Sequence, residues 1–156
     1  MSKVIIIMGS KADSDHAGRI QKVLEELGVD CIMRIASAHK VPEKALGIIK
    51  EYSSENCVFI TVAGMSNALS GFTDANTDKP VIACPPYNEE FAGLDVLSTL
   101  RMPSGVCPMT VLGASQAALA AVKILALSDE GLRDKVKKYQ KDKRDRIEND
   151  DKEVSG

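Results

Sequence analysis

The stretch Val4-Ile5-Ile6-Ile7-Met8, which stops at Gly9-Ser10, decides the fold of this chain. Five apolar residues in succession predict a strand buried on both faces, because a strand with one face in water alternates apolar and polar residues. Strands of this kind belong to parallel sheets that are covered by helices on both sides. We therefore expect the rest of the chain to supply parallel neighbours for this strand and helices above and below it.

Apolar runs and helical patterns alternate along the whole chain. Further strands are predicted at 31–36, 57–62, 81–84 and 106–112, and Pro108 makes the last one an edge strand or a bulge. Helices are predicted at 13–27, 42–52, 93–100, 114–127 and 130–147, and a short one follows the loop 63–71. This rhythm predicts an α/β fold, a three-layer α/β/α sandwich of the flavodoxin-like type with a central parallel sheet and right-handed crossovers.

In the first predicted helix, Asp13 is placed as the N-cap and Gly28 ends the helix. Its apolar residues recur at the helical period, at Ile20, Val23, Leu24 and Leu27. His16 follows the polar residues Asp13, Ser14 and Asp15, so we expect its side chain to be solvated.

The two helices at the C-terminal end differ in character. The helix at 114–127 is apolar almost all round, which predicts burial on most sides. In so small a domain we expect this C-terminal helix to lie at a subunit interface. The last helix is mostly polar and is expected to fray into the charged tail Glu148–Gly156.

Composition narrows the class of protein. A chain of 156 residues, 44% apolar and 27% charged, suits one globular domain over 1–156. A net charge of −2 gives no electrostatic reason to expect nucleic acid or a membrane as partner. The four cysteines form no CxxC pair and no signal segment opens the chain, so we expect a reduced, cytoplasmic protein without a metal site.

Three predicted strand ends carry small or reactive residues, and in a parallel sheet they share one edge. They are Gly9-Ser10-Lys11-Ala12-Asp13, Ser37-Ala38-His39-Lys40 and Ala63-Gly64-Met65-Ser66-Asn67. Free N–H groups at helix starts favour an anion such as phosphate, and Lys11 and Lys40 could add charge. Taken alone, the first loop would be a tight turn with an N-cap, whereas three such loops on one edge favour a ligand site.

His39 is the candidate acid or base of this edge. A lone histidine after a strand is more often structural, but His39 sits between Ala38 and Lys40 without an apolar packing pattern of its own, and Lys40 could hold an anion. Ser66 lacks the pattern of an activated nucleophile, so Ser66 and Asn67 are interpreted as hydrogen-bond donors. The chain has no Walker loop and no dinucleotide fingerprint.

Five ordered motifs between Val4 and about Leu127 resemble the phosphoribosylaminoimidazole carboxylases of purine biosynthesis. They are Gly9-Ser10-x-x-Asp13, Ser37-Ala38-His39-Lys40, Ala63-Gly64-x-Ser66-Asn67, Ala83-Cys84-Pro85-Pro86 and Ser98-x-Leu100-Arg101-Met102-Pro103-Ser104-Gly105. The family has a class that carboxylates aminoimidazole ribonucleotide (AIR) directly with CO2 and a class that rearranges a carbamate. The mutase class typically has a second histidine where this chain has Ala68, arginine at Lys40 and tryptophan near Ser14. The chain therefore resembles the direct carboxylases, although these often have arginine at Met65.

The resemblance implies a role for each part of the site. Ser10, Asp13 and Lys40 would hold the ribose phosphate, Ser66 the CO2, and His39 would be the general acid/base. The whole implied substrate-binding set is Gly9, Ser10, Asp13, Ser37, Ala38, Lys40, Ala63, Gly64, Ser66, Asn67, Met102 and Pro103. The resemblance also implies that the protein is a carbon–carbon lyase that uses no ATP, metal, biotin or other cofactor. It further implies a homo-oligomer, either a tetramer or an octamer.

Three alternatives stay open at this point. One is the mutase reaction on the same fold, and another is a nucleotide-binding module without catalysis. A flavodoxin-like redox protein is disfavoured because the first loop lacks a hydroxyl-rich cradle and the chain has no tryptophan to stack on a flavin.

Overall fold

The structure is a computed structural model that describes residues 2–156. Five strands form one parallel sheet in the order β2-β1-β3-β4-β5. Their bounds are β1 Lys3–Met8, β2 Asp30–Ile35, β3 Cys57–Val62, β4 Val81–Ala83 and β5 Met109–Thr110. This is the strand order of doubly wound, flavodoxin-like folds, which confirms the predicted class.

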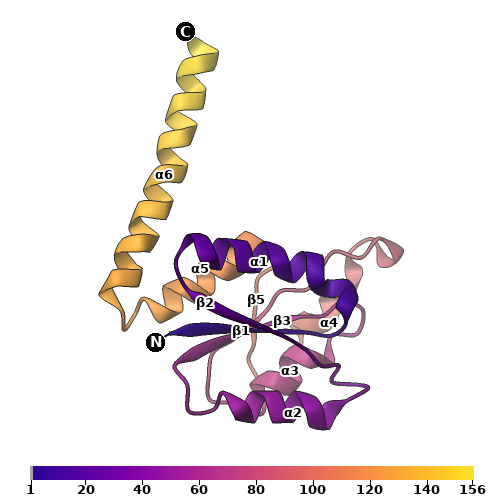
Figure 1. The fold of residues 1–156 in the computed structure, drawn as a ribbon. Helices are drawn as coiled ribbons and strands as arrows, with labels where there is room; N and C mark the ends of the chain where they lie inside the picture. Colours follow the sequence, from indigo (N-terminus) through magenta and orange to yellow (C-terminus); the bar gives the residue numbers. More distant parts are fainter. Residues whose placement is uncertain (1) are drawn as a thin grey trace.

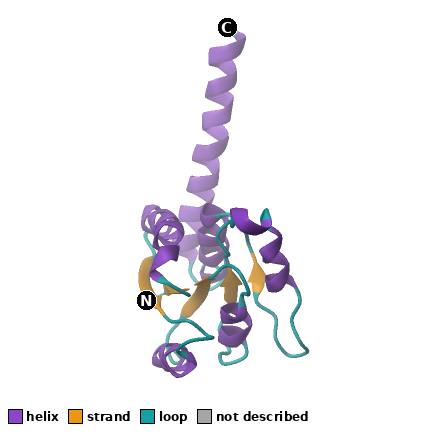
Figure 2. Cartoon of the chain, turned by 90° about the vertical axis from the view of Figure 1, so that its right-hand side faces the viewer, coloured by secondary structure: helices purple, strands orange, loops and turns teal. Residues whose placement is uncertain are grey.

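Helices cover both faces of the sheet (Figure 1). One face is covered by α1 (Ser14–Glu26) and α5 (Ala114–Leu125), and the other by α2 (Pro42–Glu51) and α3 (Ala68–Asp74). Figure 2 shows the strands lying between the two helical layers. Successive side chains of β1 pack into the apolar cores on opposite faces of the sheet. Val4 and Ile6 face α1, while Ile5 and Ile7 face α2. All four side chains are fully buried, and such burial stabilises a fold by about 1.5–3 kcal/mol each.

The start of α1 differs from expectation in two ways. Asp13 occupies the N-cap position, but its side chain makes no bond to the helix and turns back to Ser10 instead. His16 is not solvated: its side chain is 8% exposed and touches Cys84. The prediction relied on the polar neighbours of His16, whereas the position four residues before Ile20 is on the apolar face of the helix.

The region between β4 and α5 is less regular than predicted. Gly93 has a φ of +78°, which no α-helix accommodates, so the 3₁₀ turn Leu94–Val96 (η3) comes first and α4 spans only Leu97–Leu100. The fifth strand pairs only at Met109–Thr110, because Pro108 cannot donate to the ladder.

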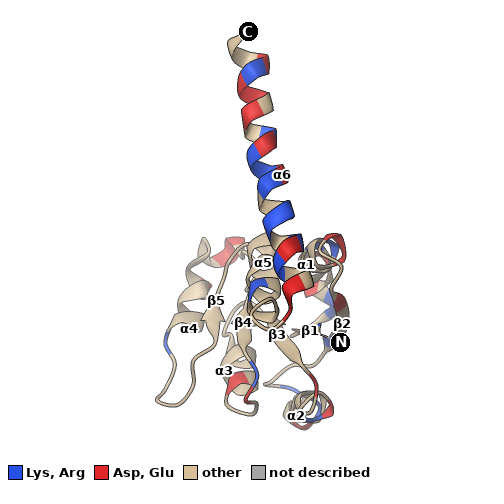
Figure 3. Cartoon of the chain, turned by 90° about the vertical axis from the view of Figure 1, so that its left-hand side faces the viewer, with Lys and Arg blue, Asp and Glu red and all other residues tan. Residues whose placement is uncertain are grey.

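The prediction that the last helix ends near Ile147 is wrong, because α6 runs from Glu130 to Ser155 and includes most of the expected tail. It projects away from the sheet and carries charge along its length (Figures 1 and 3). Ion pairs one turn apart, such as Arg146 with Asp150, support a helix that lacks apolar contacts there. No helix among residues 2–156 is long and apolar enough to cross a membrane.

The apolar helix α5 finds most of its burial within its own chain. Five of its residues pack into the core shared with α1 and the sheet: Ala117, Ala118, Ala121, Val122 and Leu125. Its apolar character therefore does not by itself require another subunit.

Candidate active site

A cleft of about 570 Å³ opens at the carboxyl ends of the strands. It lies beside the boundary between β1 and β3, where the strand order of the sheet reverses. Open α/β sheets bind their ligands in this place. The three predicted loops line it together with a fourth segment, Pro86–Glu89. Of the predicted residues, the cleft brings together Gly9, Ser10, Asp13, Ser37, Ala38, His39, Lys40, Ala63, Gly64 and Ser66.

The loop after β1 is folded by a reciprocal pair of polar contacts. The Asp13 carboxylate accepts from the Ser10 backbone N–H at 2.9 Å and from the Ser10 hydroxyl at 3.3 Å. The Ser10 hydroxyl in turn accepts from the Ala12 N–H at 3.2 Å. This capping box holds a hydroxyl and a carboxylate at one end of the cleft, where both can meet a polyhydroxylated ligand.

Gly9 allows the first and third loops to approach each other. A Cβ on Gly9 would lie 3.3 Å from the Ala63 Cβ, and the Gly9 N–H donates to Val62 O at 2.9 Å. A larger residue would push the two loops apart and widen the cleft.

The turn after β2 presents His39 and Lys40. The Ser37 hydroxyl accepts from the Lys40 N–H at 3.3 Å, and the Ser37 carbonyl accepts from the Val41 N–H at 2.9 Å. Both side chains that carry chemistry, His39 and Lys40, are exposed to the cleft. A proton carrier and a cation therefore stand side by side on a turn that is fixed by its own hydrogen bonds.

The loop after β3 is fixed from outside by η3 and α4. The Met65 N–H donates to the Asp95 carboxylate at 2.9 Å, and the Asn67 N–H donates to the Ser98 hydroxyl at 3.0 Å. Met65 has a φ of +57°, a left-handed conformation that costs a residue other than glycine free energy. These bonds maintain the bend that turns Ser66 toward the cleft.

Three predicted substrate-binding residues do not line the cleft of their own chain. The Asn67 side chain is buried, donates to the Thr99 hydroxyl at 3.1 Å and accepts from the Ser70 N–H at 3.2 Å, so it holds α3 and α4 together. Met102 packs against Gly71, where a Cβ would lie 2.9 Å from its sulfur, and Pro103 is exposed outside the cleft.

The fourth wall of the cleft, Pro86–Glu89, was not predicted. Pro85-Pro86 favours a stiff loop, because proline suits neither a helix interior nor a central strand, but nothing in the sequence placed that loop over the cleft. Gly93 makes the arrangement possible, because a Cβ there would lie 2.8 Å from the Tyr87 ring. Four other residues that line the cleft were not in the predicted substrate-binding set: Ala12, Met65, Ala68 and Leu69.

The charges of the cleft are mixed. Lys40 can pair with a phosphate, while the carboxylates of Asp13 and Glu89 are acceptors for hydroxyl or amino groups. Among the described residues no cluster of three His, Cys, Asp or Glu has the arrangement of a metal site. The arrangement suits a small phosphorylated molecule that carries hydroxyl groups and exchanges a proton with His39.

Comparison with known proteins identifies the family. The AIR carboxylase family model matches residues 3–146. The chain belongs to the AIR carboxylase family. This confirms the resemblance drawn from the five motifs and the expectation of an enzyme.

Relatives of the family match over nearly the whole chain. A phosphoribosylaminoimidazole carboxylase of Archaeoglobus fulgidus is 60% identical over 152 residues, which cover 97% of this chain and 84% of the relative. The human bifunctional phosphoribosylaminoimidazole carboxylase/phosphoribosylaminoimidazole succinocarboxamide synthetase is 40% identical over 129 residues, which cover 81% of this chain and 30% of the human protein. The crystal structure of Treponema denticola PurE matches with a TM-score of 0.97 and 42% identity over 100% of both chains. The AIR carboxylase fold thus accounts for α6 as well as for the sheet.

Proposed function

We propose that this AIR carboxylase joins CO2 directly and reversibly to AIR, giving 4-carboxy-5-aminoimidazole ribonucleotide without ATP, metal or biotin. The observation that carries the proposal is the single imidazole of the cleft. Ala68, where mutases of the family typically have a second histidine, lines the cleft as the first residue of α3. Among the described lining residues, His39 is thus the one histidine.

The proposed reaction needs only one proton carrier. AIR is an enamine, so its ring carbon four is nucleophilic and attacks CO2 directly. The new C–C bond leaves that carbon tetrahedral, bearing a proton and a carboxylate. His39 takes the proton, the electron pair of the C–H bond restores the aromatic ring, and in the reverse direction His39 returns the proton before CO2 leaves.

The other cleft residues position the two substrates. We propose that Ser10 and Asp13 bind the ribose phosphate part from one end while Lys40 pairs with the phosphate. Ser66 and the neighbouring backbone N–H groups would hold CO2 or the new carboxylate. Holding CO2 beside the nucleophile converts a bimolecular encounter into an oriented one, which is where much of the acceleration would arise.

Two further parts of the proposal concern the protein in its cell. We propose a homo-oligomer, because large apolar side chains from the 3₁₀ turn Glu89–Phe91 (η2) through α4 are exposed in the single chain. They are Phe91, Leu94, Leu97 and Leu100, each 56–63% exposed. We also propose a cytoplasmic location, where the four free cysteines would stay reduced.

The test supplies AIR and bicarbonate with carbonic anhydrase and without ATP, and in parallel supplies the preformed carbamate. The proposal expects product from AIR at a rate proportional to CO2 at low CO2 concentrations. If the enzyme turns over only the carbamate, it is a mutase. If it turns over neither but binds AIR, it is a nucleotide-binding module.

A further inference from the structure

Directly behind the cleft, three side chains that the proposed reaction does not use are joined in a line. Arg19 Nη2 lies 3.1 Å from His16 Nδ1, and His16 Nε2 lies 3.2 Å from Cys84 Sγ. The Cys84 thiol points on to Leu112 O at 3.8 Å. The line therefore connects α1, the end of β4 and the segment after β5.

Donor chemistry fixes the direction of every bond in this line. A guanidinium only donates, so His16 Nδ1 is the acceptor and carries no proton. The proton of a neutral imidazole must then be on Nε2, which donates to Cys84 Sγ. The thiol hydrogen is left free to donate to Leu112 O. Both ring nitrogens of His16 and the Cys84 sulfur therefore have partners, and these bonds hold only for one tautomer of His16.

The line is not a second catalytic centre. Cys84 is completely buried, and burial raises the pKa of its thiol to about 12, against a small opposing effect of Arg19. Burial, with the charge of Arg19, also lowers the pKa of His16, while the Asp13 carboxylate acts in the opposite direction. Both groups therefore stay neutral at neutral pH, and neither a thiolate nucleophile nor an ion pair forms.

The line ends beside two walls of the cleft. His16 lies three residues after Asp13, which closes the capping box of the first loop. Cys84 is followed by the buried Pro85 and then by Pro86, whose Cγ would lie 3.6 Å from a Cβ on Gly64 in the third loop. A change in the distance between α1 and β4 would thus move the first loop relative to the Pro86–Glu89 wall.

We propose that Arg19, His16 and Cys84 are positioning residues that set the width of the cleft by tying the first loop to the Pro86–Glu89 wall. The proposal rests on the proposed carboxylation, since a misplacement of about 1 Å at the substrate can cost on the order of 100-fold in rate. None of the three lines the cleft.

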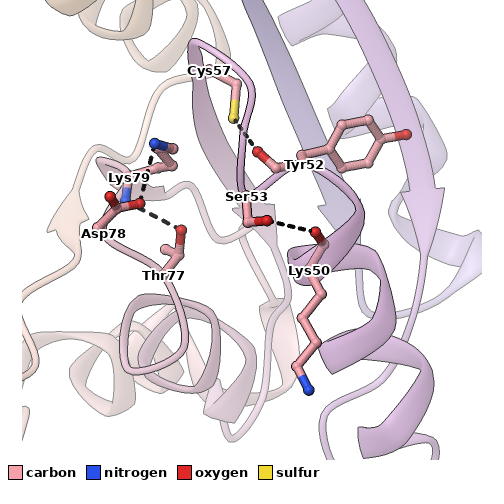
Figure 4. Close-up of polar contacts among 7 residues, drawn as sticks. All are labelled: Lys50, Tyr52, Ser53, Cys57, Thr77, Asp78 and Lys79. Atoms are coloured by element: carbon pink, nitrogen blue, oxygen red, sulfur yellow. Dashed lines mark hydrogen bonds and ion pairs between the residues drawn. The ribbon is translucent and has the colours of Figure 1, made fainter.

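The kinetic test replaces Cys84 by valine, which keeps the volume and suits a strand but removes both sulfur bonds. We expect kcat/KM for AIR to fall about tenfold or more, and Cys84→Ser, which can accept and donate, to recover most of it. The matched control is Cys57→Val. Cys57 is also buried and donates to Tyr52 O at 3.7 Å (Figure 4). It is the first residue of β3, at the opposite end of the strand from the cleft.

The outcomes separate the two proposals. Wild-type turnover is measured first, and its absence would refute the carboxylation. If the wild type is active and Cys84→Val changes only thermal stability, as Cys57→Val is expected to do, the positioning role is refuted.

A second test needs no variant at His16 or Cys84 and no turnover. The chain has two histidines, so ¹⁵N-histidine NMR of the wild type and of His39→Asn assigns both rings. We expect His16 to be the neutral Nε2–H tautomer at pH 7.5, because burial lowers the pKa of its ring. An imidazolium or an Nδ1–H tautomer would overturn the proposed line of bonds.

Discussion

Lys40 and His39 are neighbours in sequence, yet their proposed tasks differ and can be separated by kinetics. The Ser37 hydroxyl fixes the turn that carries both, so replacing one side chain should leave the other in place. His39 should affect the chemical step, and Lys40 should affect the binding of the phosphate.

We expect Lys40→Met to raise KM for AIR by about 10–100-fold with kcat within about threefold of wild type. A hydrogen bond to a charged group contributes roughly 1.5–3 kcal/mol, which corresponds to this range of affinity. Steady-state kinetics measures it, and Lys44→Met, an exposed lysine on α2 outside the cleft, is the control. A fall in kcat with unchanged KM would contradict the phosphate role of Lys40.

The pKa of His16 also predicts how stability depends on pH. Burial lowers the pKa of His16 in the folded chain. As the pH falls through about 6.5, the imidazole is therefore protonated in the unfolded chain before it is protonated in the folded chain. The contribution is fully present above that pH and is lost as the pH falls toward the folded pKa, by at most about 1.4 kcal/mol per pH unit.

Urea unfolding of the wild type and of His16→Gln between about pH 8 and 5.5 tests this expectation. The free energy of unfolding of the wild type should fall more steeply below pH 6.5 than that of the variant. Parallel curves would show that His16 titrates alike in the folded and unfolded chains.

Among the elements, those with a strong apolar pattern could be predicted and those governed by tertiary contacts could not. The β1 run and the apolar face of α1 gave the correct layers, because periodicity reports burial directly. The length of α6 was missed since a polar helix has no such pattern. The place of the Pro86–Glu89 wall depends on Gly93 meeting Tyr87, a contact that no local signal contains.

At the candidate site, the sequence indicated the three strand-end loops but not how each side chain is used. Asn67 follows Ser66 directly, yet its amide is turned away and holds Thr99. Consecutive residues of a loop need not face the same side, so residue type alone could not separate the two.

Helix α4 supports the third loop mainly through Ser98. Its hydroxyl accepts from the Asn67 N–H and can donate to Met65 O at 2.9 Å or Asp95 O at 2.8 Å. We expect Ser98→Ala to lower the free energy of unfolding by about 1–3 kcal/mol, because a buried N–H loses its acceptor, and to lower kcat/KM for AIR as the loop loosens.

Denaturant unfolding and steady-state kinetics on the same preparation measure both effects. Ser53→Ala is the matched control, since the Ser53 hydroxyl makes one bond, to Lys50 O at 2.9 Å (Figure 4), and Ser53 does not line the cleft. Equal kinetic effects of the two substitutions would show that α4 does not support the site.

On the scale of the whole molecule, the exposed apolar side chains of η3 and α4 form the surface that we expect another subunit to bury. We expect Leu94→Glu with Leu97→Glu to shift the sedimentation coefficient from that of an oligomer to that of a monomer, because a charge is costly in an apolar interface. Leu127→Glu is the control, because Leu127 is even more exposed (80%) and lies in the turn between α5 and α6, away from α4. A wild type that sediments as a monomer would contradict the proposed assembly.

The central claim, that His39 moves the proton during direct carboxylation, is tested most directly by comparing wild type with His39→Asn. Both are given AIR and bicarbonate with carbonic anhydrase and without ATP, and AIR binding is measured separately by calorimetry. The account predicts turnover by the wild type, a loss of at least about 10²–10⁴-fold in His39→Asn, and AIR affinity within a few-fold of wild type. Turnover by His39→Asn within tenfold of the wild type would contradict it.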